Sequence, residues 1–293
     1  MNRIIVLDIG AAQFRALFGY LGLYKKMIDN IMEEKKYNIY QAKNELVSRM
    51  KNRVIYLSNP DYTFCNMVSG YCNQLKVDME DLFICAQDYG SWRKEISTVY
   101  KSQRRTFLID KIMECLSVDE EAAKEWIQNQ YETFNDLYQK LSESLPFYFI
   151  KQYKCEADDV ASVCCRYYRD KEIILISTDA DWEMLLTFPN VKIWSPVSKK
   201  YKIVPNPMKV LLDKIQGDVS DNLLEKPSSE LEFEKRKKIV DLISPLPENI
   251  ENPIKEALNK IMPKNVYLHK VPFPSIRTKF SKIYKTENND EKN

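Results

Sequence analysis

The sequence of 293 residues predicts an α/β fold, in which a mainly parallel central sheet is flanked by helices. Three short apolar runs indicate strands that are buried on both faces, because such strands are continuously hydrophobic. They are IIVL at 4–7, LFICA at 82–86 and EIILIST at 172–178. Helical patterns separate the runs, as expected when crossover helices join parallel strands.

The segment between the first two strands is predicted to be helical. AAQFRALFGYLG follows the first strand as a helix, and a charge-mixed, mainly helical stretch continues to about residue 53. Between residues 61 and 77 apolar side chains recur at i, i+3 and i+4, which indicates an amphipathic helix with Asp61 as its N-cap. We expect this helix to pack on the sheet.

The rest of the chain adds strands and then changes character. Residues 101–145 are helical and strongly charged, which indicates an insertion between strands, and NVKIWSP at 190–196 is a further strand. Later helical segments are separated by prolines, so we expect one domain at 1–204 and a helical C-terminal region at 205–293. The last residues, TENNDEKN, form a polar tail that we expect to be disordered.

Composition narrows the classes of function. Lys and Arg total 44 against 42 acidic residues, so any affinity for nucleic acid must come from local patches. The only histidine is His269, which argues against His-rich zinc sites and serine-type triads. Seven cysteines without a CxxC pair, and the lack of signal-peptide or membrane-spanning patterns, favour a soluble cytoplasmic protein with no membrane partner.

Acidic residues follow or neighbour the predicted strands and form the most informative pattern. In open α/β sheets ligands bind outside the carboxyl ends of the strands, so these side chains should converge. Converging carboxylates need cations, and hard oxygen ligands select Mg²⁺ or Mn²⁺. Any one acid is equally well explained as a turn or helix cap. The set is Asp8, Asp88, Glu156, Asp158, Asp159, Asp179, Asp181, Asp218 and Asp221.

Spacing within three motifs supports this convergence. The ExDD motif at 156–159 lies at a helix start, where two acids can point the same way while the third faces aside or caps the helix. The DxD motif at 179–181 has strand spacing, which places both carboxylates on one side of the chain. GDVSDN at 217–222 brings two acids together on one helical turn.

With these motifs in this order, the chain resembles the flap endonuclease and 5′-to-3′ exonuclease family of PIN-like 5′ nucleases, in particular its bacteriophage RNase H branch. The similarity rests on IVLDIGAAQFRALF, FICAQDYGSWRKEISTVYKSQRR, CEADDVA, ISTDADWEML and KIQGDVSDN, from residue 4 to about 222. It implies a metal-dependent, structure-specific 5′ nuclease that removes RNA primers and 5′ flaps during replication and repair. Its expected partners are DNA with a 5′ flap, nick or RNA primer and a single-strand-binding protein or replication clamp, and we expect a monomer.

The resemblance also implies two Mg²⁺ ions, which Mn²⁺ can replace. Two ions about 3.5–4 Å apart activate water and neutralise the leaving oxygen during in-line displacement. Around the first ion it places Asp8, Asp88, Glu156 and Asp158, and around the second Asp179, Asp181, Asp218 and Asp221.

A basic stretch follows Asp88 and is the predicted phosphate-binding part of the site. By resemblance, Lys101 and Arg104 are catalytic residues that stabilise the charge developing on the scissile phosphate. Arg93, Lys94 and Arg105 are predicted to contact nucleic acid. A solvated helix face is the simpler alternative for any basic run.

Two further features concern how DNA is held. By resemblance, the segment at about 106–153 forms a helical arch for the single-stranded 5′ end, and 205–293 is a DNA-binding region. The family commonly continues into a glycine-rich helix-hairpin-helix, yet this chain has no glycine after Gly217. EKRKK at 234–238 is therefore the candidate for duplex phosphates, with a plain surface helix as the alternative.

Two other functions are compatible with parts of the pattern. One is a PIN-like ribonuclease that acts on cellular RNA, against which the chain length, the insertion and GDVSDN argue. The other is a non-catalytic scaffold that binds branched DNA, against which the complete set of acids argues. RNA-versus-DNA preference does not follow from the sequence.

Overall fold

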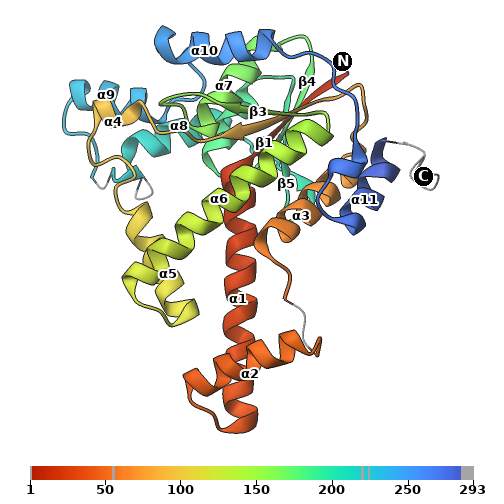
Figure 1. Cartoon of the computed structure of the whole chain (residues 1–293). Coiled ribbons are helices and arrows are strands. Elements are labelled where there is room, and N and C mark those ends of the chain that lie inside the picture. The colour runs from red at the N-terminus through yellow and green to blue at the C-terminus, as the bar shows by residue number, and fades with distance from the viewer. Residues whose placement is uncertain (1, 55–56, 219–220, 224, 285–293) are drawn as a thin grey trace. The chain divides into compact units, whose positions relative to one another are not determined.

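The computed structural model describes residues 2–54, 57–218, 221–223 and 225–284, and the side chains of Arg104 and Arg105 lie outside its described part. Its sheet has six strands in the order β3-β2-β1-β4-β5-β6 (Figure 1). The strands are β1 Arg3–Asp8, β2 Leu82–Gln87, β3 Phe147–Lys151, β4 Glu172–Ile176, β5 Val191–Ser195 and β6 Lys200–Tyr201. The first five pair in parallel, and β6 pairs antiparallel with β5. The predicted α/β class with a mainly parallel sheet is therefore confirmed.

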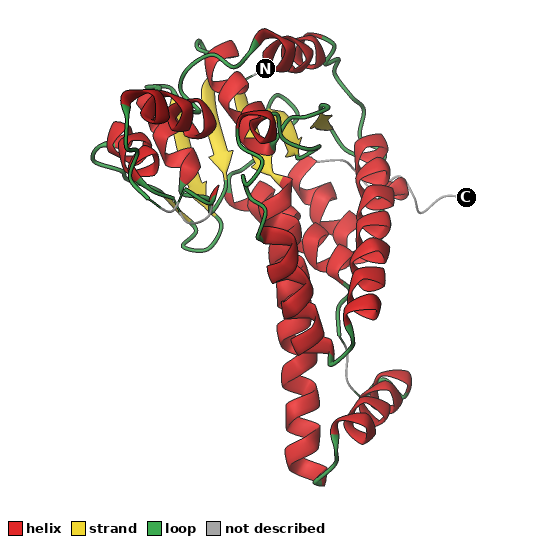
Figure 2. Ribbon diagram, turned by 90° about the vertical axis from the view of Figure 1, so that its left-hand side faces the viewer, coloured by secondary structure: helices red, strands yellow, loops and turns green. Residues whose placement is uncertain are grey.

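Strand register places the predicted acids at one edge of the sheet. In β1, Leu7 lies beside Cys85 of β2 on one side and Ile176 of β4 on the other. The carboxyl ends of these three parallel strands are thus level. Figure 2 shows the strands of the sheet in yellow, among the helices in red. Residues that follow them along the chain start from a common edge, as the sequence predicted.

Helices make up most of the remaining described chain. They are α1 Ile9–Lys35, α2 Ile39–Lys51, α3 Pro60–Gln74, α4 Arg93–Ile96, α5 Arg104–Leu116, α6 Glu120–Ser144, α7 Ala157–Tyr167, α8 Pro207–Gln216, α9 Glu230–Val240, α10 Glu248–Asn259 and α11 Pro274–Tyr284. Two 3₁₀ helices, η1 Asp181–Thr187 and η3 Leu268–Lys270, complete the set used below.

The chain divides into two compact units. The first comprises Met1–Ala12, Ser69–Ser102 and Tyr138–Asn293, and the second comprises Gln13–Val68 and Gln103–Leu137. All the described acids of the predicted site lie in the first unit.

One hydrophobic core holds the first unit together. Val6 and Ile84 of the sheet belong to the same buried cluster as Ile239 of α9 and Ile254 of α10. The C-terminal helices therefore share one hydrophobic core with the strands that carry the acids. A DNA-binding role for 205–293 stays a prediction.

The second unit has small cores of its own. Leu21 of α1 packs with Leu108 and Ile112 of α5, while Ile31 of α1 packs with Leu46 of α2. Helix α2 begins with a capping box, in which the Asn38 side chain accepts a hydrogen bond from the backbone of Gln41.

Some elements differ from expectation. Strand β3 lies inside the segment predicted as an insertion, and the antiparallel β6 was not predicted either. Both are edge strands of the sheet. In β3, buried and exposed residues alternate only partly, so its sequence carries a weak hydrophobic pattern. Helix α3 begins at Pro60 rather than after Asp61, because proline suits the first helical position. The carboxylate of Asp61 instead accepts from the neighbouring N–H of Tyr62 at 2.8 Å.

Candidate functional site

Asp8 is held at the junction of β1 and α1. Its Oδ1 accepts a hydrogen bond from the N–H of Ala11 at 2.9 Å, in the manner of a helix N-cap. Its Oδ2 accepts from the hydroxyl of Ser177, which follows β4, at 3.1 Å. The side chain is buried, with 8% of the residue exposed. Strand pairing and helix capping thus fix this carboxylate before any ligand binds.

Asp88 lies beside Asp8, just after β2. Its Oδ1 accepts from the N–H of Ala157, the first residue of α7, at 2.6 Å. Gly10 lies against both acids, since a methyl group there would come 3.4 Å from Asp8 Oδ1 and 3.8 Å from Asp88 Oδ2. The positive ends of α1 and α7 therefore face two adjacent carboxylates.

Crowding raises the pKa values of these acids. Burial raises the pKa of Asp8 to about 7, and the charges of Asp158 and Asp88 add to the shift. Asp88 is exposed as a residue, although its Oδ1 is bonded to Ala157. Loss of water around that carboxylate, together with the charge of Asp158, raises its pKa to about 6. Both acids resist ionisation in the absence of a cation.

The ExDD motif opens α7 as predicted, with Glu156 at the N-cap. Asp159 is fully buried and its Oδ2 accepts from the N–H of Glu156 at 2.9 Å, so this third acid caps the helix. Asp158 accepts from the indole N–H of Trp182 at 2.7 Å, which fixes its orientation. Two acids remain turned to the site, and the third is structural.

Arg93 is buried beneath this motif. It pairs with Glu156 at 3.0 Å and with Asp159 at 2.8 Å, while its Nε donates to the carbonyl of Ile239 in α9 at 2.6 Å. The residue is 1% exposed. A guanidinium so enclosed does not reach phosphate, so the predicted nucleic-acid contact of Arg93 is wrong. Instead, Arg93 ties α9 to the helix that carries the acids.

Lys101 pairs with the other carboxylate oxygen of Glu156, and it also reaches Asp158. Its Nζ is 2.6 Å from Glu156 Oε1 and 3.7 Å from Asp158 Oδ2. The backbone at Lys101 has φ of 53°, a conformation that costs energy for a residue with a side chain. Glu156 also accepts from the hydroxyl of Tyr100 at 3.1 Å. The structure therefore brings the predicted Lys101 to the acids.

The DxD motif follows β4. Asp179 Oδ1 accepts from the N–H of Asp181 at 2.9 Å, so a turn at the start of η1 replaces the predicted strand spacing. Burial raises the pKa of Asp181, the charge of Asp179 adds to this, and Lys214 opposes it. The two carboxylates are neighbours as predicted, through a different backbone geometry.

A group of three carboxylates, the acid trio, forms where η1 meets the GDVSDN motif. One oxygen each of Asp181, Asp218 and Asp221 lies within 4.8 Å of the other two. The N–H of Asp221 donates to the carbonyl of Asp218 at 3.3 Å, which holds the two acidic residues close to each other. The spacing of GDVSDN thus brought two acids together as expected.

The two predicted metal sites differ in compactness. Among the described residues, the acid trio is the group whose carboxylate oxygens converge within 4.8 Å. It contains three of the four acids predicted for the second ion. Asp8, Asp88, Glu156 and Asp158 interact electrostatically but do not reach that spacing together. Converging carboxylate oxygens are a donor set that fits a hard divalent cation.

Two residues that the sequence analysis did not identify complete the site. Lys214 of α8 pairs with both Asp181 and Asp218, and these carboxylates raise its pKa although burial opposes them. Asn222 donates from its side chain to Val99 O at 3.0 Å and to Ser102 Oγ at 2.9 Å, which ties the loop carrying Lys101 to GDVSDN. The i, i+4 spacing of Lys214 and Asp218 was a readable signal. No local sequence pattern indicates that the Asn222 side chain bonds to residues 99 and 102.

The other predicted basic residues are less involved. Lys94 lies on α4 and is exposed to solvent. Arg104 and Arg105 begin α5, and their side chains lie outside the described part of the structure. Contact of these three residues with nucleic acid or phosphate stays a prediction.

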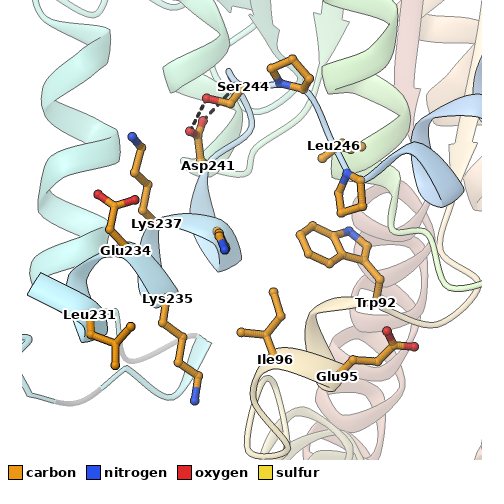
Figure 3. A pocket seen from close by; sticks show the side chains of 13 residues that line it. Trp92, Glu95, Ile96, Leu231, Glu234, Lys235, Lys237, Asp241, Ser244 and Leu246 are labelled. Atoms are coloured by element: carbon orange, nitrogen blue, oxygen red, sulfur yellow. Dashed lines mark hydrogen bonds between the residues drawn. The ribbon is translucent and has the colours of Figure 1, made fainter.

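A groove of about 940 Å³ lies between α4 and α9 (Figure 3). Trp92 and Ile96 line it from the α4 side, and its α9 side carries part of EKRKK at 234–238. The indole N–H of Trp92 donates to Asp159 at 3.3 Å, so the groove wall is bonded to the buried acid of α7. Arg236 is buried and pairs with Glu232 at 2.6 Å, whereas Lys235 and Lys238 are exposed. Contact of these two lysines with duplex phosphates stays a prediction.

A family model matches more than half of the chain. The model of the 5′-3′ exonuclease N-terminal resolvase-like domain matches residues 35–211. Ribonuclease H of Enterobacteria phage T4 is 28% identical over 139 residues, which cover 46% of this chain and 42% of that protein. The match thus spans less than half the length of this curated relative.

Solved structures show the same fold. The T5 5′-exonuclease with bound zinc has a TM-score of 0.53 at 15% identity, covering 89% of this chain and 100% of that one. The T5 D15 protein, co-crystallised with metal ions, has a TM-score of 0.50 at 17% identity, covering 96% and 97%. Among the described residues, no helix is both long enough and apolar enough to cross a membrane.

Proposed function

The chain belongs to the 5′-3′ exonuclease family, and we propose that it is a metal-dependent, structure-specific 5′ nuclease that hydrolyses phosphodiester bonds in DNA or RNA–DNA duplexes. The observation that carries this proposal is the convergence of acids from β1, β2, α7, η1 and GDVSDN at one edge of the sheet, with the acid trio within 4.8 Å. Such a site suits cleavage without a side-chain nucleophile.

Mg²⁺ is the proposed physiological ion, with Mn²⁺ as a substitute, because all the donors are carboxylate oxygens. Asp8, Asp88, Glu156 and Asp158 would hold one ion, and Asp179 with the acid trio would hold the second. Bound ions would activate water for attack on the phosphodiester and neutralise the charge that develops on phosphate.

The chain's own residues orient these groups and the phosphate. Hydrogen bonds from Ser177 to Asp8 and from Trp182 to Asp158 fix two carboxylates in advance. We assign to Lys101 the stabilisation of negative charge on the scissile phosphate, since its ammonium is held at the acids. Arg104, three residues further on, is proposed to assist it.

The proposed substrate is DNA with a 5′ flap, nick or RNA primer. Support comes from the similar phage T4 protein, which is a ribonuclease H, and from the fold shared with the T5 5′-exonuclease. Helices α5 and α6 fall in the segment proposed as the arch that holds the single-stranded 5′ end. The exposed lysines of α9 are proposed to grip the duplex backbone.

Cleavage assays test the proposal. Flapped, nicked and RNA-primed duplexes, each labelled at either end, are incubated with Mg²⁺ or with EDTA, and an Asp179→Asn variant serves as control. We expect short products from the 5′ end that require Mg²⁺ and disappear in the variant. Tight binding without cleavage in either Mg²⁺ or Mn²⁺ would refute the proposal and favour a scaffold that binds branched DNA.

A further inference from the structure

Lys214 places a positive charge inside the acid trio. It lies on α8, one helical turn before Asp218, and its ammonium pairs with one oxygen of Asp181 and one of Asp218. The Lys214 side chain is 15% exposed, and those of its partners are 13% and 9% exposed. Two of the three carboxylates that converge within 4.8 Å are therefore bonded to a cation that the chain itself supplies.

The position of Lys214 differs from that of the other lysine of α8, Lys209. Lys209 also has an i, i+4 acid, Asp213, but both side chains are more than 60% exposed. Such exposed pairs contribute little to stability, whereas a charge held between buried carboxylates is strongly coupled to them. Lys214 thus offsets the electrostatic repulsion between the carboxylates of Asp181 and Asp218.

A divalent ion and an ammonium compete for the same two carboxylates. A carboxylate that accepts a hydrogen bond from an ammonium is a poorer donor to a metal, and two positive charges at one site repel. Coordination of an ion through the oxygens that hold Lys214 requires the ammonium to leave them. Its flexible four-carbon stem allows this movement.

We propose that Lys214 is an internal competitor for the divalent ion at Asp181, Asp218 and Asp221, so that this site fills only when the ion displaces the ammonium. The inference rests on the proposed function, because it takes these acids to be a metal site. Lys214 preserves the arrangement of the acids without metal and lowers their affinity for it. The ion at the acid trio then binds more weakly than the same carboxylates would bind it alone.

Metal binding measured without substrate tests the inference. Mg²⁺ is titrated by calorimetry into the wild-type protein, Lys214→Met and Lys209→Met, and the melting temperature is recorded over the same range. Methionine keeps the length and helix preference of lysine but removes its charge. An Asp221→Asn variant identifies which binding event belongs to the acid trio.

In Lys214→Met we expect the half-saturating Mg²⁺ concentration of that event to fall at least about tenfold, or about 1.4 kcal/mol. Its melting temperature should be below wild type in EDTA and should rise more steeply with Mg²⁺. Lys209→Met should match wild type in both measurements. Unchanged or weaker Mg²⁺ binding in Lys214→Met overturns the inference.

A second variant covers the case in which Lys214→Met does not fold without metal. Lys214→Arg keeps the charge and should bind Mg²⁺ within about threefold of wild type, so a tenfold gain there also overturns the inference. Failure of the proposed function can be distinguished from failure of this inference. If the proposed function is wrong, the wild-type protein does not cleave the 5′ substrates, whatever the Mg²⁺ titrations show.

Discussion

Asp8 makes the stability of the metal-free protein depend on pH in an unusual direction. Its pKa rises from an ordinary value of 3.8 to about 7 in the folded protein. The folded state therefore binds a proton that the unfolded state has already released, and stability falls as pH rises from about 4 to about 7. Most surface acids behave in the opposite way, because pairing in the folded state lowers their pKa.

The magnitude follows from this shift. Each pH unit between the two pKa values corresponds to about 1.4 kcal/mol, so Asp8 costs roughly 4 kcal/mol once fully ionised. About half of that falls between pH 5.5 and pH 8. In this window Asp88, whose pKa rises to about 6, acts in the same direction.

Urea unfolding in EDTA between pH 5.5 and pH 8 measures the effect. Wild-type protein should lose at least about 2 kcal/mol across the window, while Asp8→Asn, which has no proton to release, should lose correspondingly less. The control is Asp170→Asn, because the Asp170 side chain is 77% exposed. Saturating Mg²⁺ should flatten the wild-type dependence, since bound cations favour the ionised acids. A wild-type stability that rises with pH, or an Asp8→Asn curve parallel to wild type, would refute the reasoning.

Three further predictions concern the basic residues. Lys101→Ala should lower turnover about 100-fold with little loss of duplex affinity, measured by single-turnover cleavage and equilibrium binding, and the reverse pattern would make Lys101 a phosphate anchor. Arg93→Gln and Arg166→Gln each break a buried ion pair and should each cost about 3 kcal/mol in urea unfolding. Of these two arginines only Arg93 contacts an acid of the predicted metal site, Glu156. In cleavage assays run well below the melting temperature, Arg93→Gln should therefore need more Mg²⁺ than wild type, whereas Arg166→Gln should not. Equal effects of the two variants would make the role of Arg93 purely structural. Replacing Lys235 and Lys238 with Ala should weaken duplex binding and reduce the slope of log affinity against log salt by about one per lysine, and an unchanged slope would exclude them from the interface.

The sheet and its acidic edge could be predicted because both follow from short stretches of sequence. A buried parallel strand is a continuous apolar run, and register places residues that follow such runs at one edge. Asp8 after IIVL and Asp181 after EIILIST are therefore readable without a structure. Strand β3 was missed because its alternation is incomplete and it lies at the sheet edge.

The cations were harder to assign because their roles are set by tertiary packing. Arg93 and Lys94 are neighbours in a basic run, yet the first is 1% exposed and the second faces solvent. What separates them is α9, whose Ile239 carbonyl accepts from Arg93 across 146 positions of sequence. A charge pattern gives the number of basic groups in a segment, whereas only packing decides which of them is enclosed.

Lys101 and Lys214 place two lysine ammonium groups at the two halves of the acidic edge. Lys101 pairs with Glu156 on one side, and Lys214 pairs with two members of the acid trio on the other. Asn222 connects these halves, because it follows Asp221 in sequence and its side chain bonds to residues on both sides of Lys101. Displacement of Lys214 from Asp218 would change the start of GDVSDN, which has a short covalent and hydrogen-bonded path to the loop of Lys101. Binding of an ion at the acid trio is thus expected to be coupled to the placement of Lys101, the residue proposed to stabilise charge on the phosphate.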